Sequence, residues 1–201
     1  PEPGSVDVPR KVEVVVQAGI DLPVREGAAP ATKPVVEVRF QGQSVLTEVK
    51  AGANPIWNQI ILLDMTTDDW SQKALLDLPD EISFNLFDQI RRSERDEREA
   101  NVRVQRDERR WLGGFSLPFS TLYRSGKVEG SFPLNLPPIL LGYEKDDQSP
   151  SSKQQLVPSS ALRLFATVEP ALPPPKDKER ERVSTRDAKM QEAAAAWVKK
   201  L

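Results

Sequence analysis

Acidic side chains that could hold a hard cation gather in the middle of the chain. Asp88 follows an apolar segment, and Asp96, Glu97 and Asp107 lie within or beside the charged stretch Arg91 to Arg110. Calcium takes about six to eight oxygen ligands and favours carboxylates. Arginines interleave these acids, however, and compete for them as ion-pair partners. The stretch therefore raises the question of a calcium site and also weakens the case for one.

The chain lacks most of the residue types and motifs that enzymes use for catalysis. The chain contains neither histidine nor cysteine, which excludes imidazole bases, thiol nucleophiles, disulfides and almost every zinc site. It also lacks a phosphate-binding glycine loop and the G-x-S-x-G turn of hydrolases. We therefore predict that the protein is not an enzyme and has no catalytic residue, cofactor or bound metal.

The overall charge argues against polyanionic partners. A formal net charge of −2, from 28 basic and 30 acidic residues, gives no general positive field for nucleic acid or an anionic bilayer. The 201 residues can form one core, while 18 prolines indicate solvated loops or tails. No apolar run is long enough to cross a membrane, so we expect a soluble intracellular protein that does not bind nucleic acid.

Candidate strands must position these side chains. Apolar and polar residues alternate in short segments separated by turn residues, as in half-buried strands. Eight segments predict an all-β, antiparallel sandwich: Lys11 to Ala18, Pro34 to Phe40, Ser44 to Lys50, Trp57 to Leu63, Ile82 to Phe87, Trp111 to Leu117, Lys127 to Leu136 and Ala161 to Val168. Trp57 is expected to anchor the core, and Gly113-Gly114 to allow a close backbone approach. Thr66 to Asp80 is expected as a surface connection with a short helical turn.

Composition divides the chain into three parts. We predict an N-terminal tail at 1–10, one domain at 11–170 and a Pro-rich, charged linker with a terminal helix at 171–201. The helix would start near Ser184, because Met190, Ala194, Trp197, Val198 and Leu201 form one apolar stripe. It could dock on the sandwich or begin a following module. Residues 89–110 are expected as a long charged loop or a short exposed helix, which is either solvated or forms an arginine-rich surface.

Several stretches together resemble a C2 domain. They are Val16 to Pro23, Pro34 to Val38, Asn54 to Asn58 and Leu86 to Asp88. Two further segments, Arg110 to Tyr123 and Gly130 to Tyr143, resemble the family of coiled-coil and C2 domain-containing protein 2A, and the likeness spans roughly 11–170. The resemblance implies a C2-type sandwich, with type II topology favoured, within a longer protein. It also implies a site at the cytoplasmic side of the cilium base, in the transition zone or basal body and associated with the cytoskeleton, with Meckel-syndrome and tectonic proteins as partners.

The same resemblance locates the loops that bind calcium in C2 domains. Lys33 stands where the family has aspartate, and an earlier ligand position falls near Arg25, with Glu26 as the acid beside it. In the third loop Asp88 is kept, but Ile90 replaces the second aspartate. Too few carboxylates remain to hold the ion. We therefore predict a calcium-independent scaffold module that binds other proteins.

Peripheral attachment to phosphoinositide membranes remains the alternative. It would use loop tips or the arginines of the charged stretch, namely Arg91, Arg92, Arg95 and Arg98. The segment Leu46 to Lys50, which matches the strand that carries a lysine cluster in membrane-binding C2 domains, has a single lysine. Membrane contact is therefore expected to be weak.

Overall fold

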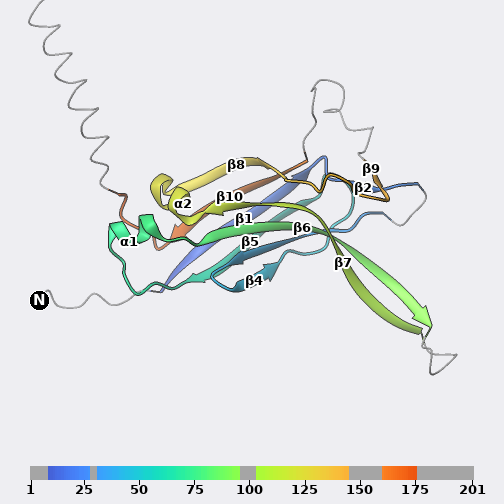
Figure 1. The fold of residues 1–201 in the computed structure, drawn as a ribbon, viewed down its shortest axis with the longest axis horizontal. Helices are drawn as coiled ribbons and strands as arrows, with labels where there is room; N and C mark the ends of the chain where they lie inside the picture. The colour runs from blue at the N-terminus through green and yellow to red at the C-terminus, as the bar shows by residue number, and fades with distance from the viewer. Residues whose placement is uncertain (1–8, 28–30, 96–102, 145–159, 176–201) are drawn as a thin grey trace, which may run out of the picture.

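A computed structural model describes residues 9–27, 31–95, 103–144 and 160–175 (Figure 1). Its elements are β1 (Arg10–Ile20), β2 (Val24–Arg25), β3 (Pro34–Phe40), β4 (Gln43–Leu46), β5 (Ile56–Met65), α1 (Gln72–Asp77), β6 (Glu81–Arg95), β7 (Arg103–Pro118), α2 (Phe119–Ser125), β8 (Lys127–Pro133), β9 (Tyr143–Glu144) and β10 (Ala161–Glu169). Residues 171–175 form no regular element. The predicted helix from Ser184 lies outside the described residues.

Two four-stranded antiparallel sheets form the sandwich. Their strand orders are β5-β1-β10-β8 and β4-β3-β6-β7, and β2 pairs with β9 as a separate ribbon. The first strand lies between β5 and the last strand, β10, which is the type II connectivity of C2 domains. The predicted sandwich is therefore confirmed, with two short strands added.

Alternation along the strands creates the core. Val12, Val14 and Val16 of β1 are fully buried, as are alternate residues of β6 such as Ile82 and Leu86. Because successive side chains point to opposite faces, each sheet presents one apolar face to the other. Each buried aliphatic side chain of this kind contributes about 1.5–3 kcal/mol.

An aromatic stack connects the sheets. The ring of Phe84 on β6 lies 4.7 Å from that of Phe115 on β7, and Phe115 lies 5.3 Å from Phe132 on β8. Trp57 is buried as predicted, and its indole N–H donates to the carbonyl of Glu48 at 2.7 Å. The contact between Phe115 and Phe132 joins the two sheets across the core.

The connections differ in part from the prediction. A short helix does form between β5 and β6, where Ser71 caps α1. By contrast, β4 ends at Leu46 and not at Lys50. Here Thr47 takes over the bonding to β3: its amide donates to the Val36 carbonyl at 2.8 Å, and its hydroxyl accepts from the Val36 amide at 2.9 Å. The segment after Leu46 is therefore irregular but stays along β3, since the Lys50 amide also donates to the Pro34 carbonyl at 3.1 Å.

The expected loop at 89–110 is wrong for most of its length. β6 and β7 continue beyond the sandwich as a two-stranded ribbon, which projects at the right of Figure 1. We call residues 89–95 and 103–110 the arm. Its backbone ladder runs from Gln89 opposite Arg109 to Arg95 opposite Arg103. These strands form because a ladder that has started in the sheet can extend at little cost. The sequence did not predict them because their charged residues show no apolar alternation.

A bulge separates the arm from the sandwich. The register shifts between Leu86 and Phe87, so that Leu112 of β7 is the extra residue. Bulges bend a strand and increase its local twist. Close by, a Cβ on Gly114 would lie 2.6 Å from the Phe84 carbonyl oxygen. The predicted close backbone approach at the paired glycines is thus confirmed.

Candidate functional site

A buried carboxylate marks the end of the sandwich where the arm begins. Asp88 follows Phe84 and Leu86 at two-residue spacing on β6, so it lies on the same inward face, and it is fully buried. Its backbone pairs with Pro34 at the start of β3. A buried charge must be paired and hydrogen-bonded, or it destabilises the fold severely.

Four donor atoms from three residues surround the Asp88 carboxylate. The Arg25 guanidinium binds it with two bonds, from Nε to Oδ2 at 2.6 Å and from Nη2 to Oδ1 at 2.7 Å. The Tyr143 hydroxyl donates to Oδ2 at 2.6 Å, and the Lys33 backbone amide donates to Oδ1 at 2.8 Å. We call Arg25, Lys33, Asp88 and Tyr143 the Asp88 cluster. Both carboxylate oxygens are saturated by short, charge-assisted bonds.

The β2–β9 ribbon positions the two side-chain donors. Arg25 lies opposite Tyr143 in its register, and the Arg25 amide donates to the Thr32 hydroxyl at 2.8 Å. The Arg110 guanidinium packs 5.0 Å from the centre of the Tyr143 ring. Segments distant in sequence thus hold the donors at one point.

Electrostatics favours the ionised carboxylate. Burial alone raises the pKa of Asp88 and is the largest single influence, but hydrogen bonds from Arg25, Tyr143 and the Lys33 amide together outweigh it, so the pKa is lowered. The bond to Asp88 also raises the pKa of Arg25. For Tyr143, burial and then the bond to Asp88 raise the pKa.

The lowered pKa of Asp88 predicts acid sensitivity. A group whose pKa is depressed by folding stabilises the fold above its unfolded pKa of about 3.9, and this contribution disappears as the pH falls through the folded value. Asp88→Asn should therefore lose more stability relative to wild type at pH 6 than at pH 3, as measured by urea unfolding at both values. Asp68→Asn, at an exposed position, is the control and should show no such difference. An equal loss for Asp88→Asn at both values would contradict the assignment.

The predicted calcium-ligand positions do come together, but as an ion pair. Arg25 lies against Asp88 as the resemblance implied, whereas Lys33 contributes its backbone amide. Asp107 is instead bound by Arg91 at 2.9 Å on the arm. Asp96 and Glu97 lie outside the described residues. Among the residues that the structure describes, no group of three or more histidine, cysteine or acidic side chains could hold a metal ion.

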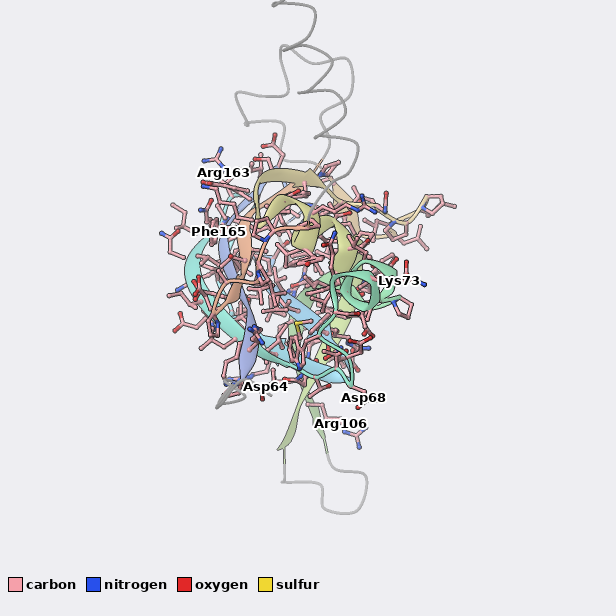
Figure 2. The ribbon with its side chains drawn as sticks, turned by 90° about the vertical axis from the view of Figure 1, so that its left-hand side faces the viewer. Asp64, Asp68, Lys73, Arg106, Arg163 and Phe165 are labelled. Atoms are coloured by element: carbon pink, nitrogen blue, oxygen red, sulfur yellow. The ribbon has the colours of Figure 1, made fainter. Side chains whose placement is uncertain are left out.

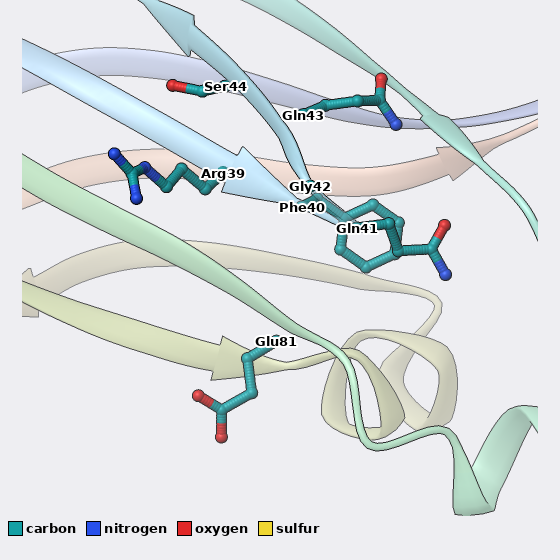
Figure 3. Close-up of a pocket in the computed structure, with 7 residues that line it drawn as sticks. All are labelled: Arg39, Phe40, Gln41, Gly42, Gln43, Ser44 and Glu81. Atoms are coloured by element: carbon teal, nitrogen blue, oxygen red, sulfur yellow. The ribbon is translucent and has the colours of Figure 1, made fainter.

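A pocket lies at the other end of β3 from the Asp88 cluster. Its volume is about 420 Å³, and it is lined by Arg39, Phe40, Gln41, Gly42, Gln43, Ser44 and Glu81 (Figure 3). Arg39 is engaged by Glu37, its Nε lying 2.8 Å from Oε2. Figure 3 shows Arg39 and Glu81 extending from different strands at the rim. Ser44, which also lines the pocket, donates its hydroxyl to Glu37 Oε1 at 2.8 Å. Among the described residues, no helix is long and apolar enough to cross a membrane.

Sequence reasoning missed Tyr143 as part of the cluster. It lies 55 residues from Asp88, and its segment was noted for a family likeness and not for chemistry. A buried tyrosine needs a hydrogen-bond partner, but the sequence does not reveal which one.

Comparison with known proteins agrees with this fold. The C2 domain family model matches residues 10–134, more than half of the chain. Human protein CC2D2B is 28% identical over 191 residues, which covers 84% of this chain and 13% of that protein. Drosophila melanogaster coiled-coil and C2 domain-containing protein 2A is 26% identical over 148 residues, covering 69% of this chain and 10% of that protein.

A solved structure of CC2D1B superposes with a TM-score of 0.50 at 15% identity, covering 90% of this chain and 62% of that one. At that identity the likeness concerns the fold. The chain spans about one-eighth or less of the curated relatives it matches. The sandwich topology, the matched family model and the two homologues together establish that this chain belongs to the C2 domain family and is homologous to protein CC2D2B and to coiled-coil and C2 domain-containing protein 2A.

Proposed function

We propose that this C2 domain is a calcium-independent, non-enzymatic protein-binding module of a scaffold at the ciliary transition zone. The observation that carries the proposal is the bidentate pairing of Arg25 with Asp88. A guanidinium at this carboxylate supplies the positive charge that a calcium ion would supply, and it offers no oxygen ligand. With Ile90 at the second position, the loop end keeps a structural ion pair in place of an ion site.

Homology supports the setting of the proposal. One relative is a coiled-coil and C2 domain-containing protein, and this chain matches 13% or less of each of the two relatives. The family resemblance points to the cytoplasmic side of the cilium base, with Meckel-syndrome and tectonic proteins as partners. A rigid sandwich with a projecting arm suits docking within such an assembly.

Affinity capture tests the proposal. The 201-residue chain should capture Meckel-syndrome or tectonic proteins from ciliated-cell extracts, equally with calcium and with a chelator, as identified by mass spectrometry. Millimolar calcium should not raise the Tm, whereas a ligand at a hundred times its Kd stabilises a fold by about 2.7 kcal/mol. Capture that requires calcium, or a Tm that rises by several degrees, would contradict the proposal.

Peripheral membrane binding is the second candidate. Ile139 and Leu141 are each 73% exposed in the segment that leads to Tyr143, at the end of the sandwich where the arm also begins. Exposed apolar residues beside arginines suit an anionic lipid surface. Co-sedimentation with phosphoinositide vesicles separates the candidates: pelleting that is lost in Ile139→Ser/Leu141→Ser, without capture of the named proteins, would favour the membrane.

A further inference from the structure

Beyond Gln89, whose amide donates to the Lys33 carbonyl at 2.9 Å, the described strands of the arm have two open edges. β3 pairs with β6 as far as Asp88, so the described part of β6 beyond that point has β7 as its strand partner. Within the sandwich the outer edge of β7 is covered: Gly114 and Asn135 exchange backbone bonds of 3.1 and 2.9 Å. From Arg110 outward, no third strand lies beside this ribbon among the described residues. Open edges of this kind are templates for an added strand.

The charge of the arm differs sharply from that of the chain. Its strands contain seven arginines and three acidic residues, a net charge of +4, while the whole chain carries −2. Residues 96–102, which connect the two strands in sequence, contain three acidic residues and one arginine. Basic charge therefore runs along the two strands.

The register places like charges together. Arg92 lies opposite Arg106, and Arg95 lies opposite Arg103. Like charges at directly opposed positions destabilise a ladder, and a ribbon of two strands has little stability to spare. Arg106 is exposed on the arm, clear of the sandwich (Figure 2). Bound carboxylates would convert this repulsion into attraction.

We propose that the arm binds an extended acidic segment of a partner protein, which adds to an open edge as a further strand. Carboxylates at every second position of such a segment would lie on one face, beside either the Arg92–Arg106 pair or the Arg95–Arg103 pair, because these two pairs fall on opposite faces of the ribbon. Arginine is suited to them because its planar fork binds a carboxylate with two bonds. A strand also satisfies the backbone groups of the edge, which a lipid headgroup cannot do along the length of the arm. The inference rests on the proposed protein-binding function and specifies that the segment bound by the arm is acidic and extended.

Peptide binding by the 201-residue chain tests this inference. The probe is a fluorescein-labelled peptide of alternating glutamate and threonine, as long as one strand of the arm, and the readout is fluorescence anisotropy. Binding should weaken as salt rises from about 50 to about 200 mM. The variant Arg92→Glu/Arg95→Glu/Arg103→Glu/Arg106→Glu should bind roughly tenfold more weakly or worse.

A matched control carries the same change of charge elsewhere. It is Lys73→Glu/Arg124→Glu/Lys127→Glu/Arg163→Glu, at four exposed positions away from the arm, and its affinity should stay within about twofold of wild type. The same four arm arginines changed to glutamine provide a second variant with less repulsion, expected to weaken binding as well. Circular dichroism and Tm establish that each variant is folded.

Defined results would overturn the inference. They are absence of peptide binding by wild type, equal weakening in the control, or equal affinity for a glutamine–threonine peptide. Arm-dependent binding of phosphoinositide vesicles or duplex DNA in place of the peptide would also overturn it. If wild type captures the transition-zone proteins and the arm variant still does, this inference fails while the proposed function stands. If wild type captures none, the proposed function fails, and the peptide result still decides the inference.

Discussion

Asp88→Ala should lower the free energy of unfolding by about 3–5 kcal/mol, because it leaves the Arg25 guanidinium largely buried without its anion. The Arg25 side chain is 12% exposed and the Asp88 side chain is fully buried. The substitution also leaves the Tyr143 hydroxyl without its acceptor. Urea unfolding near neutral pH measures the loss, which is a large part of the total stability of a typical domain.

Two variants separate the buried pair from general effects of losing an aspartate. Asp107→Ala removes an aspartate from the exposed ion pair with Arg91, in which the Asp107 side chain is 44% exposed. This substitution should change stability little, because solvent screens such pairs. Arg25→Met/Asp88→Leu removes both charges and should recover the part of the loss that comes from the unpaired guanidinium, since apolar pairs often replace buried ion pairs at no cost. A loss below about 1 kcal/mol for Asp88→Ala would show that the pair is not a structural centre.

Phe84→Ala should be similarly damaging, at about 3–5 kcal/mol. Phe84 is fully buried and stacks on Phe115, which in turn stacks on Phe132 of the other sheet. Truncation removes buried apolar area and leaves a cavity between the sheets, which close-packed neighbours fill only in part. Thermal or urea unfolding gives the measurement.

A surface truncation provides the comparison for Phe84→Ala. Ile60 of β5 faces outward and is 61% exposed, so Ile60→Ala should fall within about 0.5 kcal/mol of wild type. If Phe84→Ala cost no more than Ile60→Ala, the aromatic stack would not be part of the stabilising core.

The sandwich could be predicted because its strands carry the apolar alternation that burial on one face requires. Val12, Val14 and Val16 identify β1, and Leu162, Leu164 and Ala166 identify β10, with boundaries within a few residues. Pairing of these two strands was not visible, because about 150 residues separate them and alternation does not name a partner. The arm was missed for a different reason. Its strands bury no face, so their charged sequence lacks the two-residue alternation of apolar and polar residues by which a strand is predicted.

The site was predicted in outline. Likeness to C2 domains placed Arg25 and Lys33 near Asp88, and both are there. The sequence could not show that Lys33 acts through its backbone amide, because the type of a side chain does not indicate which hydrogen bonds the backbone of that residue makes. Nor could it show that Tyr143 completes the cluster, because β9 is two residues long and is held in place by β2.

The pairing of β1 with β10 has a mechanical consequence. Lys11 near the start of β1 lies opposite Glu169 at the end of β10. The polypeptide therefore enters and leaves the sandwich side by side, on the side of the domain away from the arm (Figure 1). Tension applied through flanking polypeptide would pull these neighbours apart in the direction of their interstrand bonds, which lie perpendicular to antiparallel strands. The bonds would then bear the load one after another, as in a zipper. Under such pulling the domain would open at low force, while a load between the arm and the termini would act along the strands and be shared by many bonds at once.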